Sequence, residues 1–327
     1  MPEFPPQSWL QRRWPWLALL VVTASLCGAA LVRSNRRPPG EEEFKTERYI
    51  IPQPAVTELV VKQAAQAELA PDELVLGATL GGESRAYPLN MLNAEPRTKV
   101  LNDVLGGRDI AVTWCDRCRA GIVFDRRVGD MTLTLAVFGS LWRESMVLYD
   151  QETMTQWSQW DGQGRMGPLL GRRLECLPSN IAAWQDWLRQ YPDSTVVILE
   201  RRQAEFAGET YRPADQYVLS VGTGAAAKAW TLSELAKRRV VNDGWQDKSV
   251  VAFYLAASGT ARLFERQLDG RTLTFCCAAD AFHDVETGSV WSPLSGQALA
   301  GPLLGRRLTA LPATVSSQAA WQRFQVR

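Results

Sequence analysis

The chain has 327 residues, of which 46% are hydrophobic and 22% charged, as in a packed globular protein with room for two domains. Its 36 Lys and Arg residues nearly cancel its 35 Asp and Glu residues. That balance leaves no basic excess to bind a phosphate backbone, so nucleic acid is not an expected partner. The single histidine, His283, excludes a multi-histidine metal site and argues against Ser-His-Asp catalysis.

Residues 14–32 predict a membrane anchor, because they read WPWLALLVVTASLCGAALV and carry no charge. The alternative is a cleaved signal peptide, with small residues at 28–30 as the cleavage region. A span this close to the N-terminus usually exports the domain behind it, so we expect a single-pass protein with its soluble part outside the cytoplasm, in the periplasm of a bacterium. The Arg residues that follow the span favour the opposite orientation.

An internal repeat dominates the rest of the chain. Residues 167–174 (GPLLGRRL) recur letter for letter at residues 301–308, and several other short matches follow in the same order. These matches predict a duplicated module. They include Asn102-Asp103 with Asn242-Asp243, Trp157 with Trp291, and Trp187 with Trp321.

Within each copy the pattern is mainly that of β-strands. Residues 73–89 predict a hairpin with glycines at the turn, and short apolar runs at 109–114, 122–125 and 132–138 predict further strands. Residues 181–191 predict the one helix of the first copy, since their apolar residues follow helical spacing up to Pro192.

The expected fold is therefore α+β and β-rich, with two tandem diverged copies of one module behind an N-terminal transmembrane helix. We expect the anchor at residues 1–37, a linker at 38–70, the first copy at 71–193, a connector at 194–213 and the second copy at 214–327.

A duplicated fold provides an internal control, because features that occur in only one copy are candidates for function. The pair Cys115 and Cys118 occurs only in the first copy, where the second has Leu255 and Ser258. Residues 138–149 (FGSLWRESMVLY) are also replaced by a shorter segment, 278–283. We infer that the cysteine pair and the longer segment form one site.

Residues that both copies keep have structural roles in this interpretation. Asn102 and Asp103 recur in the second copy, which favours turn, cap and packing functions, although they are also candidate lining residues of the site. Further candidate lining residues are Arg119, Asp125, Trp142, Arg143, Glu144 and Ser145.

The spacing Cys115-Asp116-Arg117-Cys118 suits reversible thiol chemistry, because a two-residue gap closes a tight ring on oxidation. Arg117 and Arg119 would favour the thiolate, and acidic neighbours would oppose it. An apolar run follows directly, which predicts a turn between strands and not the start of a thioredoxin-like helix.

Here the chain resembles the bacterial family known as domain of unknown function 3179. The resemblance covers roughly residues 70 to 320, and it implies that the Cys-x-x-Cys pair is a hallmark of the family. It also implies redox chemistry, since some members look as if they carry selenocysteine at the pair. This chain departs from the family in having Thr98 where a histidine is usual. The resemblance rests on residues 86–89, 101–103, 112–115 with Cys118, 123–126, 148–150 with 152–153, 157–158 and 167–168.

The preferred interpretation is thiol–disulfide redox through Cys115 and Cys118 with a redox partner protein; no cofactor is certain, and a soft metal ion is the candidate. Two alternatives remain open. One is a carrier of a soft metal ion such as Cu(I), with Cys115 and Cys118 as ligands; the other is a non-catalytic interaction scaffold. An inert structural disulfide is the simplest explanation of the pair.

Overall fold

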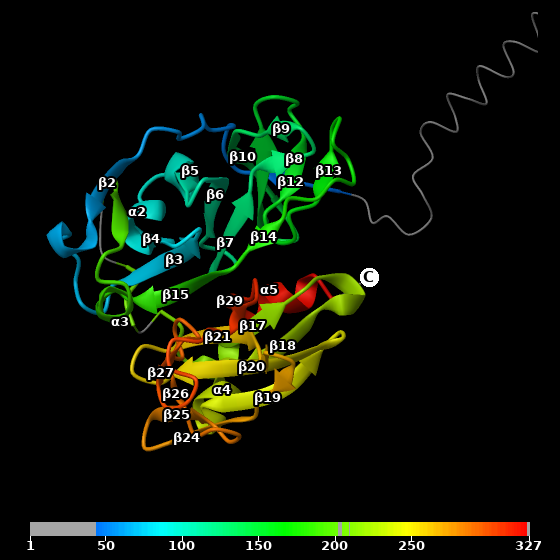
Figure 1. Ribbon diagram of the computed structural model, residues 1–327. Helices are drawn as coiled ribbons and strands as arrows, with labels where there is room; N and C mark the ends of the chain where they lie inside the picture. Colours follow the sequence, from blue (N-terminus) through cyan, green and yellow to red (C-terminus); the bar gives the residue numbers. More distant parts are fainter. Residues whose placement is uncertain (1–43, 202–204, 209, 326–327) are drawn as a thin grey trace, which may run out of the picture. The chain divides into compact units, whose positions relative to one another are not determined.

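The computed structural model describes residues 44–201, 205–208 and 210–325. The expected anchor at residues 1–37 lies outside this part of the chain. Across the described residues, no helix is long and apolar enough to cross a membrane. From Phe44 onward the chain forms one compact unit, which contains both copies of the repeat (Figure 1).

The first sheet of copy one is built on the predicted hairpin. Strands β3 (Leu74–Leu80) and β4 (Glu83–Pro88) pair antiparallel, so this prediction is confirmed. Gly81 and Gly82 form the turn with φ of +54° and +85°, a region that glycine enters without a side-chain clash. The sheet order is β15-β3-β4-β16-β2, with β15 at Ser179–Ala183, β16 at Thr195–Ile198 and β2 at Val60–Gln63.

The second sheet of copy one carries the cysteine pair. Strands β6 (Arg108–Cys115) and β7 (Ala120–Asp125) are buried along most of their length, which explains why the sequence shows apolar runs there and no alternation. The sheet order is β14-β7-β6-β5, with β5 at Val100–Leu105 and β14 at Cys176–Leu177.

The third sheet of copy one has the order β1-β10-β11-β12-β13. Its centre is the hairpin of β10 and β11, and a separate two-stranded ribbon of β8 and β9 precedes it. The bounds are β1 Glu47–Arg48, β8 Arg127–Val128, β9 Met131–Thr132, β10 Leu135–Trp142, β11 Ser145–Asp150, β12 Gln156–Ser158 and β13 Gly164–Met166.

Copy two repeats this arrangement with smaller sheets. Their orders are β18-β17-β29, β19-β20-β21-β28 and β24-β25-β26-β27, with a ribbon of β22 and β23. The bounds are β17 Tyr217–Val221, β18 Lys228–Thr231, β19 Val240–Trp245, β20 Lys248–Leu255, β21 Thr260–Glu265, β22 Gln267–Leu268, β23 Arg271–Thr272, β24 Phe275–Ala278, β25 Ala281–Asp284, β26 Val290–Trp291, β27 Ala298–Ala300, β28 Thr309–Ala310 and β29 Thr314–Ser317.

The helices in the described residues are short. The helix predicted at 181–191 is α3, which begins only at Trp184 because residues 179–183 pair with β3 as strand β15. Its counterpart in copy two is α5. The helical bounds are α2 Leu89–Leu92, α3 Trp184–Gln190, α4 Leu232–Arg238 and α5 Gln318–Arg323, with 3₁₀ turns η1 Ala64–Gln66, η2 Arg97–Lys99, η3 Ala214–Gln216 and η4 Gly224–Ala226.

Two segments that we expected to be connections belong to the sheets of copy one. The expected linker at 38–70 contributes β1 and β2, and the expected connector at 194–213 contributes β16. Strand β16 pairs with both β2 and β4, so these segments complete a sheet edge. All four residues of β2 are exposed, which leaves no apolar alternation for sequence reasoning to detect.

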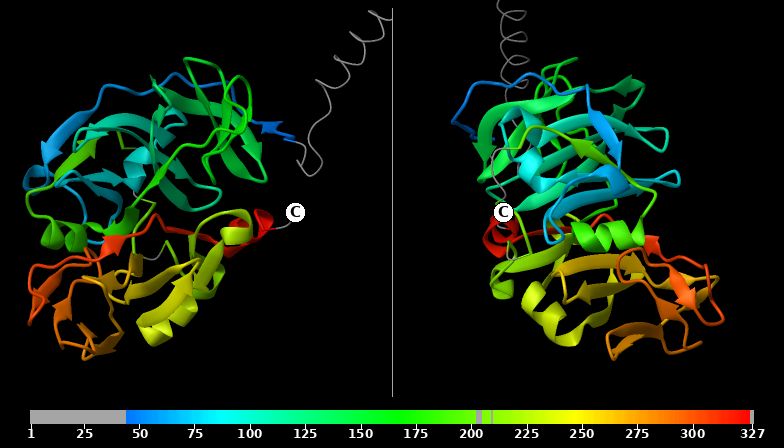
Figure 2. Two further views of the ribbon diagram at one scale, coloured as in Figure 1. Left: turned by 45° about the vertical axis from the view of Figure 1, so that its right-hand side comes forward. Right: turned by 90° about the vertical axis from the view of Figure 1, so that its left-hand side faces the viewer.

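The two copies pack on each other reciprocally. Strand β29 of copy two contacts β7 of copy one, and the equivalent β15 of copy one contacts β21 of copy two. One hydrophobic cluster contains residues of both copies, including Leu76 and Trp114 with Leu219 and Leu263. In Figures 1 and 2 the C-terminal segment, in red, and helix α3, in green, both lie along the border between the copies.

An asparagine clamp recurs in both copies. Asn102 Nδ2 donates to Leu135 O and its Oδ1 accepts from Leu135 N, each at 2.8 Å, which joins β5 to β10. Asn242 does the same to Phe275, at 2.8 and 2.9 Å. Because each clamp satisfies a buried backbone pair that would otherwise lose its partners, the repeated asparagine has a structural role.

The neighbouring aspartates also hold strands together. Asp103 and Asp243 each accept hydrogen bonds from a basic residue and from an aromatic residue on the preceding hairpin. The partners are Arg85 (2.8 Å) and Tyr87 (2.7 Å) for Asp103, and Lys228 (2.7 Å) and Trp230 (2.9 Å) for Asp243.

Candidate functional site

The cysteine pair lies in a tight turn between two strands. Strand β6 ends at Cys115 and β7 begins at Ala120, and these two residues are register partners. The predicted strand–turn–strand arrangement is therefore confirmed. Arg119 closes the turn with φ of +54°, and the Cys118 amide donates to Cys115 Sγ at 3.4 Å. The turn thus aims one backbone N–H at the first sulfur.

Both thiols are free and almost fully buried. Cys115 and Cys118 are each 1% exposed, and the two sulfurs are not bonded to each other. They belong to an apolar cluster with residues of the same sheet and of the β10–β11 hairpin, such as Ile122 and Met146. Any reagent that reaches either sulfur must therefore displace part of its cover.

The β10–β11 hairpin lies directly on the cysteine pair. Its turn is Arg143-Glu144, both with positive φ (+50° and +61°), as in a two-residue hairpin turn. The Glu144 carbonyl accepts from Cys118 Sγ at 3.7 Å, and the Ser145 side chain also hydrogen-bonds to Cys118. The structure thus brings the longer segment of copy one and the cysteine pair together. In copy two the equivalent β24 and β25 have four residues each, against eight and six in β10 and β11.

A buried polar chain that the sequence did not reveal connects the hairpin to the strands of the pair. Gln159 Nε2 donates to Thr113 Oγ1 at 3.0 Å, and Ser145 Oγ donates to Gln159 Oε1 at 3.4 Å. Gln159 has no exposed surface. Comparison of the two copies could have revealed these hydrogen-bonded side chains, since Phe253 and Pro293 occupy the positions of Thr113 and Gln159 in copy two.

The hydrogen bonds around the sulfurs distinguish the two thiols. The hydrogen bond from Cys118 lowers the pKa of Cys115 below its ordinary value; burial opposes this shift, and the backbones of Cys118 and Met146 support it. The pKa of Cys118 is raised well above its ordinary value, first because its proton is held in the hydrogen bond to Cys115 and then because burial disfavours the thiolate. Cys115 is therefore the sulfur that ionises first.

The charged residues near the turn are mostly engaged elsewhere. Lys99 Nζ pairs with Asp116 Oδ1 at 2.7 Å, which partly neutralises the carboxylate closest to the pair. The guanidinium of Arg119, which we expected beside the thiols, lies over the ring of Phe206 at 5.1 Å. The Tyr211 hydroxyl donates to Arg119 O at 3.1 Å, so the turn is braced from the segment that joins the copies.

Three of the expected lining residues lie elsewhere. Asp125 is at the far end of β7, about 17 Å from the turn at the usual strand rise, and it pairs with Arg108. Asn102 and Asp103 face the strand contacts described above and make no hydrogen bond to either thiol among the described residues. These three residues are thus better explained as structural.

The end of copy two covers the turn. Ser317 N donates to Cys118 O at 2.9 Å, and Ala320 belongs to the apolar cluster of the cysteines. Arg323 pairs with Glu144 at 2.8 Å, and its charge lowers the pKa of Cys118 slightly against the larger opposing effects. Residues 317–324, which we call the C-terminal lid, thus close the site of copy one with a segment of copy two.

Aromatic rings fix the end of the lid. Phe324 stacks on Trp160 with centroids 4.7 Å apart and meets Trp142 edge-on at 5.3 Å. The guanidinium of Arg143 lies over Trp142 and donates to Arg323 O at 2.9 Å. Trp142, Arg143 and Glu144 therefore contact the lid, and Glu144 and Ser145 contact Cys118.

The remaining cysteines and the histidine do not complete a metal site. In the described part of the chain, no group of three or more His, Cys, Asp or Glu residues is placed to hold an ion. Cys176 lies in β14, and Cys276, Cys277 and His283 lie in β24 and β25 of copy two. Among the His, Cys, Asp and Glu side chains of the described residues, only the two cysteines would thus bind a metal ion at the pair.

The family of the chain follows from comparison with known proteins. Neither the curated proteins nor the solved structures contain a significant match to it. The family described as Protein of unknown function (DUF3179) matches twice, over residues 51–213 and 202–325, which agrees with a tandem repeat of one module. The chain belongs to the DUF3179 family.

Proposed function

We propose that the protein is a thiol–disulfide redox protein in which Cys115 is the attacking sulfur and Cys118 the resolving sulfur. The observation that carries the proposal is the hydrogen-bonded pair itself: Cys115 Sγ accepts from the Cys118 amide at 3.4 Å, in a turn that copy two lacks. Backbone donors around one sulfur and a protonated neighbour stabilise a thiolate, which is the nucleophile in disulfide exchange.

The exchange reduces a partner disulfide in two steps. The Cys115 thiolate attacks one sulfur of that disulfide, a mixed disulfide forms and the other partner sulfur leaves as a thiolate that takes up a proton. The Cys118 sulfur then attacks Cys115 Sγ and breaks the mixed disulfide, and the second partner sulfur leaves and takes up the proton that Cys118 gives up. Two electrons pass from the pair to the partner, and the pair becomes a disulfide.

Access to the pair requires movement of its cover. Both sulfurs are 1% exposed beneath the C-terminal lid and the β10–β11 hairpin. Disulfide exchange needs the three sulfurs to approach each other, so a protein disulfide reaches Cys115 only after the lid opens. Lid opening then sets the rate of exchange with a folded partner.

We further propose that residues 14–32 anchor the protein in a membrane with its soluble part outside the cytoplasm, where disulfides of other proteins are available as substrates. Retention of the chain in membranes after alkaline extraction, with cleavage by protease added to spheroplasts, checks this placement. A chain that alkaline extraction releases would contradict the anchor.

The redox proposal is tested by equilibrating the full chain with thiol buffers of graded potential and counting free thiols by mass. We expect Cys115 and Cys118 to gain and lose two electrons together. Their midpoint reduction potential should lie well above roughly −300 mV, the value below which the potentials of structural disulfides lie. Cys276→Ser, which removes an exposed cysteine of copy two, should leave the midpoint unchanged. A pair that never forms a disulfide, or one that cannot be reduced, rules the proposal out. A bound ion lost in Cys115→Ser/Cys118→Ser would favour the soft-metal alternative.

The assignment of Cys115 as nucleophile predicts a pH dependence. Because its pKa lies below the ordinary cysteine value, the alkylation rate of Cys115 should rise with pH and level off at a lower pH than a free cysteine. Cys118 should remain unmodified over this range, because its pKa is raised. Peptide mapping after iodoacetamide treatment measures both rates. Preferential labelling of Cys118 would reverse the roles of the two sulfurs.

Loosening the lid should expose the thiols. Phe324→Ala removes ring contacts worth about 0.5–1.5 kcal/mol per pair, so we expect Cys115 to react about 2- to 10-fold faster with a small thiol reagent. Leu304→Ala, which truncates an exposed side chain of copy two, is the matched control and should leave the rate unchanged. Equal rates in Phe324→Ala and the wild type would show that reagents enter by another route.

A further inference from the structure

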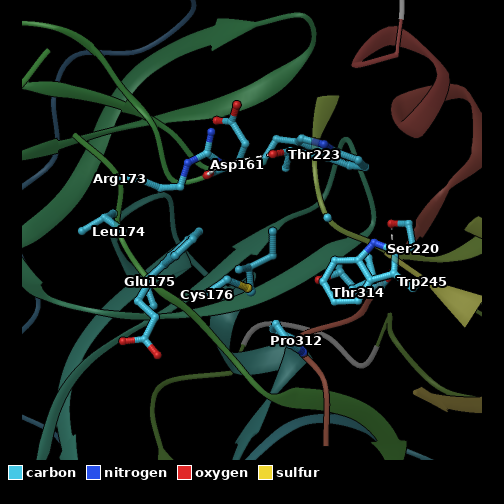
Figure 3. Close-up of a pocket in the computed structure, with 15 residues that line it drawn as sticks. Asp161, Arg173, Leu174, Glu175, Cys176, Ser220, Thr223, Trp245, Pro312 and Thr314 are labelled. Atoms are coloured by element: carbon cyan, nitrogen blue, oxygen red, sulfur yellow. Dashed lines mark hydrogen bonds between the residues drawn. The ribbon is translucent and has the colours of Figure 1, made fainter. Parts of the chain in front are cut away.

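A cavity lies between the copies, beside the cysteine site. The cavity has a volume of about 340 Å³, within the range of small-molecule sites, and residues of both copies line it (Figure 3). Strand β29 joins it to the cysteine turn, because Thr314 lines the cavity and Ser317, at the other end of the strand, donates to Cys118 O. Its lining includes Ile122, Phe124, Trp160, Cys176, Trp245 and Thr314.

The equivalent position, where β21 of copy two meets β15 of copy one, is filled by side chains. There Arg262 occupies the position of Ile122, and Asn180 occupies that of Thr314. Arg262 is buried, donates to Asn180 Oδ1 and lies over the ring of Phe264, 5.3 Å from its centroid. The shorter Ile122 and Thr314 leave the corresponding space open. The cavity is thus a difference between the copies, like the cysteine pair.

The walls of the cavity suit a flat, uncharged ligand. Trp160, Trp245 and Phe124 provide ring surfaces, and the Trp245 indole N–H is already bonded to Ala226 O at 2.7 Å. Burial raises the pKa of Cys176 to about 12, so its thiol faces the cavity as a neutral group. Aromatic surface without an ionised group inside favours planar apolar molecules.

The charged lining residues, Asp161, Arg173 and Glu175, lie at the rim, where Arg173 and Glu175 are exposed. Figure 3 shows Arg173 and Asp161 together at one end of the cavity, near Thr223. Arg173 donates to Asp161 O at 3.0 Å and to Thr223 Oγ1 at 3.1 Å, which links the copies across that end. The Asp161 carboxylate pairs with Arg165 at 2.5 Å. Glu175 pairs with Arg108 at 2.9 Å, and Arg173 keeps its charge in contact with solvent. A charged ligand deep in the cavity would therefore gain no counter-ion there and would lose its hydration.

We propose that this cavity is a binding site for a small uncharged molecule with a planar ring system. The ligand lies between the rings of Trp160 and Trp245 and takes the space that Arg262 fills in the other half of the repeat. The site is separate from the thiol chemistry, because none of its lining residues belongs to the cysteine pair.

The test uses the uncharged fluorescent probe N-phenyl-1-naphthylamine with the full chain. We expect saturable binding of one probe per chain, with energy transfer from tryptophan. Ile122→Arg/Thr314→Asn, which installs the residues of the filled counterpart, should weaken the binding at least tenfold. Leu304→Ala and Cys115→Ser/Cys118→Ser should bind as the wild type does, which separates this site from the proposed function. Subtracting the fluorescence of the Ile122→Arg/Thr314→Asn variant corrects for probe that binds to other apolar surfaces.

A second measurement on the wild type decides the matter if the filled variant does not fold. Bound probe at ten times its dissociation constant should slow modification of Cys176 by methyl methanethiosulfonate about tenfold. The exposed Cys276 should react at an unchanged rate and serves as the internal control. Binding that survives in a folded Ile122→Arg/Thr314→Asn variant, or the absence of Cys176 protection, overturns the proposal.

Discussion

The contact of β29 with β7 joins the two copies at the cysteine site. It places the C-terminal end of copy two against the strand that carries the cysteine turn, and its counterpart, β15 with β21, does the same in reverse. One apolar cluster runs through both copies as a result. The cluster of the cysteines lies in copy one except for Ala320, which copy two contributes. The thiols are thus controlled by residues about 200 positions away in the chain, such as Ser317 at Cys118.

The site combines features with opposite effects on reactivity. Two backbone donors and the Cys118 thiol favour a thiolate at Cys115, whereas burial disfavours it. The net effect is a pKa of Cys115 below its ordinary value, because the hydrogen bonds outweigh the loss of hydration. In the proposed function, such a covered thiol reacts only when its cover opens, so access and not intrinsic reactivity would select its reagents.

Sequence reasoning found those parts of this structure that have a local signal. The glycine turn of the β3–β4 hairpin and the strand that follows Cys118 were predictable because turn chemistry and apolar runs are short-range features. The match between copies also located the β10–β11 hairpin at the cysteines. Strand β2 had no such signal, because all of its residues are exposed. The C-terminal lid had none either, because Ser317 and Arg323 meet the site through tertiary packing alone.

The reciprocal packing of the copies has an evolutionary consequence. A single module with these surfaces would assemble as a twofold homodimer, in which each subunit covers the cysteine turn of the other with its own C-terminal helix. Fusion of two such genes would preserve that arrangement while freeing one half from selection on its chemistry. In this chain copy two has neither cysteine and has a buried arginine, whereas copy one has both cysteines and its neighbour's helix as a cover.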